Sequence, residues 1–175
     1  MFSNMRTKKR RAMDTKRIGF YPVCARDYLE PLQLLKGWVD EVVFCDIKCM
    51  PQSANALKDL REAAIDEELP NPSILVGDAL VAMSILKPVD LFFLRRDSTG
   101  EGGSELDLLG PKRIREVVRV IKSNGMLVTD GTNDRPWFKD FRKGRRNPYQ
   151  VGDRTIHISD QQPWKDQNLI TFIVK

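Results

Sequence analysis

The chain has 175 residues, 41% of them hydrophobic and 30% charged, and its mean hydropathy is -0.40. These values are typical of one soluble globular domain with a real core, and the longest apolar runs are too short to span a membrane. A basic start without a following apolar segment excludes a secretory signal, and three cysteines, an odd number, do not indicate a disulfide framework. We therefore expect a cytoplasmic protein without membrane attachment.

The net charge of +5 is unevenly distributed. Met5–Arg17 holds seven basic residues and Lys139–Arg146 holds five, with one acid in each segment. Clustered cations suit phosphate contacts, so we predict binding of nucleic acid or another polyanion through Arg6–Arg11 and Lys139–Arg146. The alternative is that both segments are only solvated. Residues 1–16 have no apolar period and are expected to form a disordered tail, and residues 17–175 a single domain.

Strand-like apolar runs alternate with segments of helical periodicity. The expected elements are strands at 17–22, 41–47, 73–76, 89–94, 126–130, 154–159 and 169–174, and helices at 28–38, 53–68, 78–86 and from 111 through 121. Such alternation indicates a parallel sheet with right-handed crossovers. The last two strands have no helix between them, which predicts an antiparallel edge.

Four segments follow one another in a characteristic order: Val42–Asp46, Leu75–Leu80, Val89–Leu94 and Val120–Gly131. Together they resemble the class I S-adenosylmethionine-dependent methyltransferases. The resemblance implies an α/β, Rossmann-like methyltransferase fold: a mostly parallel seven-stranded sheet with an antiparallel last strand and helices on both faces. It also implies S-adenosylmethionine as the cofactor. A plain dinucleotide-binding domain is disfavoured, because it would have a G-x-G-x-x-G loop and a helix before its sixth strand.

Acidic residues end two of the expected strands. The resemblance implies that Asp46 accepts hydrogen bonds from both ribose hydroxyls of the cofactor and that Asp78 meets the adenine amino group. The alternatives are a cap or turn role for Asp46 and a helix N-cap for Asp78. Tyr21 and Pro22 end the first strand and Asp27 follows it, and we expect all three to contribute to the same cofactor site.

The loop after the first strand departs from the family pattern. Where the family has G-x-G-x-G, this chain has the segment Tyr21–Asp27, with Val23, Cys24 and Arg26 in place of small residues. Glycines there allow positive φ and a close approach of the cofactor to the backbone. The side chains are therefore expected either to fill the space beside Asp46 or to leave an open pocket of modest affinity.

The loop after the fourth strand is the usual position of catalytic residues in this family, but it contains no recognisable catalytic motif. Asp97 and Asp130 are candidates for a base or for metal ligands. The preferred alternative is a loop without metal, in which Asp97 pairs with Arg95 or Arg96.

The sequence thus predicts an S-adenosylmethionine-dependent methyltransferase whose methyl acceptor is unknown. The alternative is a catalytically inactive methyltransferase-like module that binds nucleic acid or a protein partner through its basic segments. These two possibilities differ in whether the first loop still admits the cofactor.

Overall fold

The computed structural model describes residues 16–47, 54–97, 104, 106–131 and 147–175. The basic segments Arg6–Arg11 and Lys139–Arg146 lie outside these residues, as does Ser53, the expected cap of the second helix. None of the helices in the described part of the chain has the length and apolar character that crossing a membrane requires.

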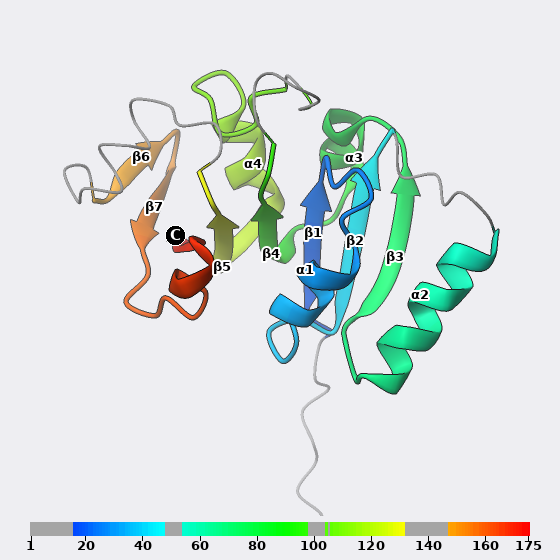
Figure 1. Cartoon of the computed structure of the whole chain (residues 1–175). Coiled ribbons are helices and arrows are strands. Elements are labelled where there is room, and N and C mark those ends of the chain that lie inside the picture. Colours follow the sequence, from blue (N-terminus) through cyan, green and yellow to red (C-terminus); the bar gives the residue numbers. More distant parts are fainter. Residues whose placement is uncertain (1–15, 48–53, 98–103, 105, 132–146) are drawn as a thin grey trace, which may run out of the picture.

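Strands and helices alternate as the sequence predicts (Figure 1). In chain order they are β1 (Ile18–Pro22), α1 (Leu29–Leu34), β2 (Glu41–Asp46), α2 (Ala54–Asp66), β3 (Asn71–Val76), α3 (Ala79–Ile85), β4 (Val89–Leu94), α4 (Ile114–Val120), β5 (Ile121–Thr129), β6 (Tyr149–Val151), β7 (Arg154–Ile158), the 3₁₀ helix η1 (Lys165–Gln167) and β8 (Ile170–Val174).

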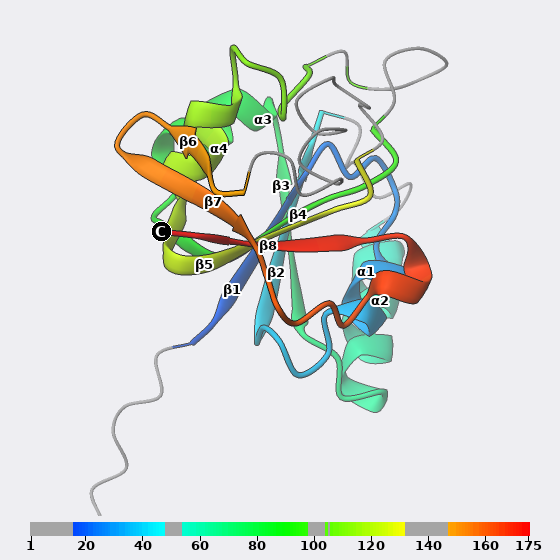
Figure 2. The same cartoon turned by 90° about the vertical axis from the view of Figure 1, so that its left-hand side faces the viewer.

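The strands form one sheet in the order β3-β2-β1-β4-β5-β8-β7-β6. Strands β1 to β5 are parallel, and β8 runs antiparallel to β5, its neighbour. The antiparallel last strand was predicted from the sequence and is confirmed; Figure 2 looks onto the edge that it forms with β7 and β6. This strand order is that of the class I methyltransferase fold, extended by one strand.

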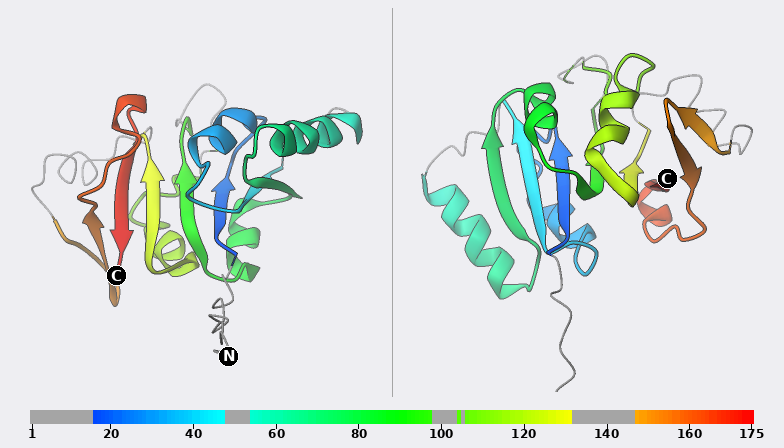
Figure 3. Two further views of the ribbon diagram at one scale, coloured as in Figure 1. Left: turned by 90° about the horizontal axis from the view of Figure 1, so that it is seen from below. Right: turned by 180° about the vertical axis from the view of Figure 1, so that it is seen from behind.

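The sheet separates two hydrophobic cores, because apolar side chains on its central strands point to both faces. Phe20 and Phe92 belong to the core under α3 and α4, whereas their neighbours Tyr21 and Phe93 belong to the core under α1 and α2. Successive residues of a strand point to opposite faces, and continuous apolar runs are typical of a sheet covered on both sides. Figure 3 shows the two helix layers on either side of the strands.

The sheet has eight strands, not the seven that were predicted. The additional strand is β6, which pairs with β7 through a tight turn at Gly152 and Asp153. Gly152 has a φ of +64°, which suits the left-handed position of a two-residue hairpin turn. The extra edge strand is therefore a local hairpin and leaves the order of the other strands unchanged.

Several element boundaries differ from the predicted ones. Helix α1 ends at Leu34, before the predicted end at Trp38, and Gly37 follows with a left-handed φ of +79°. Helix α4 ends at Val120, and Ile121 already pairs with Val89 as the first residue of β5. The predicted start of β5 at residue 126 was wrong because residues 122–125 bulge out of the ladder, with Asn124 at a φ of +63°.

Strand β3 begins at Asn71 and contains Pro72, which was expected to lie before the strand. Proline has no backbone N–H to donate to a neighbouring strand, so within sheets it is tolerated mainly in edge strands. Strand β3 is such an edge, since within the described residues it pairs with β2 alone.

Candidate functional site

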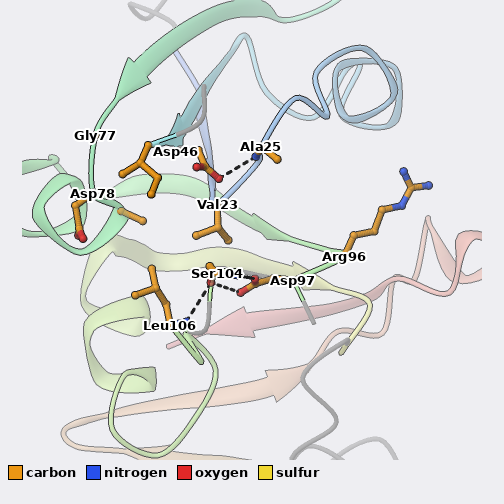
Figure 4. Close-up of a pocket in the computed structure, with 11 residues that line it drawn as sticks. Val23, Ala25, Asp46, Gly77, Asp78, Arg96, Asp97, Ser104 and Leu106 are labelled. Atoms are coloured by element: carbon orange, nitrogen blue, oxygen red, sulfur yellow. Dashed lines mark hydrogen bonds between the residues drawn. The ribbon is translucent and has the colours of Figure 1, made fainter. Parts of the chain in front are cut away.

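A cavity of about 210 Å³ lies at the carboxyl ends of the parallel strands. In open α/β sheets this edge binds ligands, close to the point where the strand order reverses, here between β1 and β4. The lining residues come from the carboxyl end of β2 and from the segments that follow β1, β2, β3 and β4: Val23, Ala25, Asp46, Ile47, Gly77, Asp78, Ala79, Arg96, Asp97, Ser104 and Leu106 (Figure 4). The cavity therefore occupies the position that the fold reserves for a ligand.

The first loop has a left-handed backbone at two residues that are not glycine. Val23 has a φ of +50° and Ala25 a φ of +47°. Their spacing of two residues matches that of the glycines in the G-x-G pattern. A positive φ is a marked outlier for a β-branched residue such as valine. The loop therefore keeps positive φ at these two positions although the glycines that would favour it are missing.

Neighbouring groups hold this strained loop in place. The backbone N–H of Ala25 donates to Oδ2 of Asp46 over 2.9 Å. The N–H of Cys24 bonds to the carbonyl of Cys45, and that of Asp27 to the carbonyl of Cys24. Cys24 is buried at 1% exposure. Residues in sparsely populated backbone regions persist only where their surroundings fix them, and Asp46 is one of the groups that do so here.

The side chains of the first loop differ in what they obstruct. Val23 lines the cavity, whereas Cys24 points into the core and the exposed Arg26 is not among the lining residues. The predicted obstruction beside Asp46 is thus carried by Val23 within the described residues.

Asp46 lies on the cavity wall at the end of β2, with 9% of its surface exposed. Its carboxylate is oriented by the Ala25 N–H, which gives it a structural role in the loop. A carboxylate accepts up to about four hydrogen bonds, so this contact alone does not exhaust its acceptor capacity. The position fits the predicted ribose ligand, and the ribose contact itself remains a prediction.

Asp78 is the N-cap of α3. Its Oδ1 accepts hydrogen bonds from the N–H groups of Leu80, at 2.7 Å, and Val81, at 3.1 Å. The cap interpretation is therefore confirmed, and Asp78 also lines the cavity. Both roles are compatible, since capping uses one oxygen of the carboxylate.

Tyr21, Pro22 and Asp27 do not line the cavity. Tyr21 is buried in the core below α1, and its hydroxyl lies 3.1 Å from Asp27 Oδ2. Arg95 holds Asp27 through two hydrogen bonds of 2.8 Å and binds Glu30 at 2.7 Å. The predicted cofactor contact of Tyr21 and Asp27 therefore has no support in this geometry, because their polar atoms belong to an ion-pair cluster beside the loop.

Burial and charge perturb the groups of this cluster. Burial raises the pKa of Tyr21, and the carboxylate of Asp27 raises it further. Burial alone would lower the pKa of Arg95, but its hydrogen bonds to Glu30 and Asp27 outweigh that effect and raise it. Arg95 lowers the pKa of Glu30. These pKa shifts favour a neutral Tyr21 beside an ion pair of Arg95 and Glu30. Such a cluster stabilises the structure around the first loop.

The two candidate catalytic acids have different surroundings. Asp97 is 4% exposed and lines the cavity, and both of its oxygens accept from Ser104, at 2.7 Å from the N–H and 2.8 Å from the hydroxyl. The expected pairing with Arg95 or Arg96 was wrong. Asp130 accepts the backbone N–H of Arg96 at 2.9 Å and is not a lining residue. Within the described residues, no three potential metal ligands converge.

Sequence reasoning missed two features of this site. Arg95 lies 68 residues from Asp27, and its only sequence signal was a pair of arginines directly after a buried strand. Ser104 was hidden in a Gly-rich loop, where no periodicity indicated which polar residue would turn toward Asp97.

Comparisons with known proteins found similar chains among solved structures. No family model and no curated protein matches the chain. Among solved structures it is similar to an rRNA methylase from Streptococcus thermophilus, with 12% identity, a TM-score of 0.49, and coverage of 91% of this chain and 86% of the other. It is also similar to the 16S rRNA methyltransferase KamB, with 12% identity, a TM-score of 0.48, and coverage of 91% of this chain and 88% of the other. A methyltransferase from Geobacter sulfurreducens is similar as well, with 14% identity, a TM-score of 0.47, and coverage of 91% of this chain and 71% of the other.

At such low identities these similarities assign neither activity nor substrate. The fold class rests on the strand order itself, which defines a Rossmann-like, mostly parallel sheet with an antiparallel last strand.

Proposed function

We propose that this chain binds S-adenosylmethionine in the cavity and transfers its methyl group to an acceptor that is not yet identified. The observation that carries the proposal is the convergence of Asp46, Asp78 and a left-handed first loop at the carboxyl edge of the sheet. The proposal requires no nucleophile from the protein, because S-adenosylmethionine supplies a methyl group already activated on a sulfonium. The chain would then act mainly by aligning the reactants.

The charge of the cavity supports this ligand. Three lining residues are carboxylates, Asp46, Asp78 and Asp97, and Arg96 is the one cation among the described lining residues. The Arg96 side chain is 63% exposed and extends away from the cavity (Figure 4). A cavity lined by carboxylates favours a ligand that carries a sulfonium and an ammonium group.

The hydrogen-bonding groups suit the parts of an adenosyl ligand. The carboxylate of Asp46 would hold the ribose hydroxyls while it keeps the Ala25 N–H in place. Asp78 would lie near the adenine, and the buried Asp97 at the other side of the cavity would face the amino-acid part or the acceptor. Ser104 fixes the orientation of Asp97 through both of its oxygens.

Isothermal titration with S-adenosylhomocysteine tests this function. We expect saturable binding to the wild type and a loss of at least about tenfold for Asp46→Asn, because a charge-assisted hydrogen bond to a buried diol is replaced by a neutral one. Asp153→Asn is the matched control: it removes the same charge from the exposed β6–β7 turn. Equal affinity of Asp46→Asn and the control would remove Asp46 from the site.

We further propose that the basic segments Arg6–Arg11 and Lys139–Arg146 bind a polyanion such as nucleic acid. The uneven distribution of charge supports this proposal. Met5–Arg17, which contains the first basic segment, and Lys139–Arg146 together hold twelve of the 29 basic residues. Clustered cations give salt-dependent affinity without special geometry. This second function is independent of cofactor binding, and a chain that binds a polyanion but no adenosyl compound would favour the binding-module alternative.

A further inference from the structure

Helix α4 and the turn before it carry a row of exposed cations. Lys112 lies in the turn that leads into the helix, Arg115 follows three residues later, and Arg119 four residues after that. Residues four apart are neighbours on a helix surface, so Arg115 and Arg119 share one face of α4. All three side chains are exposed, and we call them the α4 row. This outer face of α4 therefore presents a line of positive charge to the solvent.

No carboxylate pairs with the α4 row in the part of the chain that the structure describes. Glu116 is the nearest acid in sequence, and its Oε1 lies 3.2 Å from Nη1 of Arg113, which is not in the row. Arg119 donates one hydrogen bond of 2.9 Å to the backbone carbonyl of Met83 in α3, and a guanidinium has five N–H donors. The cations of the row are therefore available to an external anion.

The positive charge of the chain is concentrated in three places. Residues 112–122 hold five cations and one acid, in addition to the two basic segments already described. Because the whole chain has a net charge of only +5, the remainder is net acidic. Helix α2 shows the contrast: an acid directly follows each of its two cations, and Lys58 Nζ lies 3.5 Å from Glu62 Oε1. The α4 row is thus a local excess of charge and not a sample of an evenly charged surface.

The second basic segment joins the described structure near this row. The segment ends at Arg146, and β6 begins three residues later at Tyr149. Strand β6 contacts α4, and Figure 2 shows the two elements side by side. The chain therefore leaves its second basic segment on the side of the molecule that carries the α4 row.

The row suits the phosphates of a nucleic-acid duplex. From Lys112 to Arg119 it spans about 10 Å at roughly 1.5 Å per residue, and a duplex offers one phosphate charge per roughly 1.7 Å of its axis. A membrane surface is also anionic, but a membrane-bound helix places its apolar face among the lipids. The apolar face of α4, with Ile114, Val117 and Val118, is buried in the core. The observations therefore favour nucleic acid over lipid.

We infer that the outer face of α4 is a nucleic-acid interface in which Lys112, Arg115 and Arg119 contact the phosphate backbone. Contacts to phosphates position a duplex and carry no sequence information directly. This site is distinct from the two basic segments, because it consists of described side chains on and beside a helix that the fold already holds in place. It does not depend on cofactor binding.

Fluorescence anisotropy of the full chain with labelled RNA duplexes of two unrelated sequences tests the inference. The test variant replaces the three cations of the row: Lys112→Gln, Arg115→Gln and Arg119→Gln. The control variant removes the same charge from three exposed positions on the α1 and α2 side of the sheet: Lys36→Gln, Lys58→Gln and Arg61→Gln. Circular dichroism confirms that both variants are folded. If the test variant is not folded, Lys112→Gln with Arg115→Gln replaces it, since neither side chain makes a hydrogen bond within the described residues.

The test variant should bind both duplexes at least about tenfold more weakly than the wild type at low salt, because each lost phosphate contact forgoes the release of counterions. The slope of log affinity against log salt should fall by about 2–3, close to 0.9 for each contact. The control variant should stay within about threefold of the wild type, since charges farther than a Debye length from the bound duplex are largely screened.

Equal affinity and salt slope of the test and control variants would overturn the inference and leave binding through the two basic segments standing. A loss confined to one of the two sequences would contradict the assignment to backbone phosphates. Binding of the wild type to phosphatidylserine vesicles but to neither duplex would identify a lipid surface instead. If the wild type binds none of these probes, the polyanion binding proposed for the basic segments fails together with the inference.

Discussion

The left-handed backbone at Val23 leads to a quantitative prediction about stability. Replacement of Val23 by glycine removes a half-buried side chain, which costs about 1 kcal/mol. It also adds freedom to the unfolded chain, a further cost of roughly 0.5–1 kcal/mol. Against these, the replacement releases roughly 1–2 kcal/mol of backbone strain, because glycine adopts a φ of +50° without a Cβ clash. The effects nearly cancel, so the free energy of unfolding of Val23→Gly should lie within about 0.5 kcal/mol of the wild type.

Val43 provides the comparison. It is also partly buried against the same core, but it lies within strand β2, where the backbone is extended and no such strain is released. Val43→Gly should therefore lose about 2 kcal/mol, the sum of the two costs alone. Urea unfolding followed by circular dichroism measures both variants. Equal losses at Val23 and Val43 would refute the reasoning that the first loop stores strain.

Further predictions concern the ion-pair cluster, the cap and the basic tail. Arg95→Met should lower the free energy of unfolding by about 1–3 kcal/mol in urea titrations, because it removes the buried cation of Asp27 and Glu30 and leaves them the exposed Arg96. The hydrogen bond from Arg95 holds the pKa of Glu30 below its ordinary value of 4.5. The stability that ionised Glu30 contributes is therefore present above that pH and lost as the pH falls further. Melting temperatures should fall more steeply between pH 5 and 3 for the wild type than for Glu30→Gln. Asp78→Ala should lose about 1 kcal/mol of stability in urea, as expected for a lost N-cap, and an unchanged midpoint would argue against the cap. Deletion of residues 1–16 should reduce retention on heparin and flatten its salt dependence, unless the tail is only solvated.

The sequence predicted most strands of the sheet, but it did not predict the conformation of the loops. Continuous apolar runs such as Val89–Leu94 predicted central strands, because burial on both faces leaves a strong signal. The hairpin strand β6 was missed although the Gly152-Asp153 turn between Val151 and Arg154 is a known hairpin signal. The order of the helices and strands could therefore be predicted from local patterns. The number of strands was wrong by one because the Gly152-Asp153 turn was overlooked.

The site could be predicted only in part. Asp46 and Asp78 were found because each lies at the carboxyl end of a strand, on the edge where this fold binds ligands. The conformation of Val23 and Ala25 could not be found, since local preferences of both residues oppose a positive φ and only tertiary contacts impose it. Asp27 was assigned to the cofactor because its partner Arg95 is distant in sequence, and such ion pairs leave no periodic signal.

The central claim is that an adenosyl compound binds at the carboxyl edge of the sheet, against Asp46. Titration of the ¹⁵N-labelled protein with S-adenosylhomocysteine, followed by amide NMR shifts, tests it most directly. The account predicts that the largest shifts fall on Ala25, whose N–H bonds to Asp46, and on Ile47, Gly77 and Asp78, whereas amides of the β6–β7 hairpin remain unchanged. The absence of shifts at these lining residues at saturating ligand, or shifts confined to other parts of the chain, would contradict it.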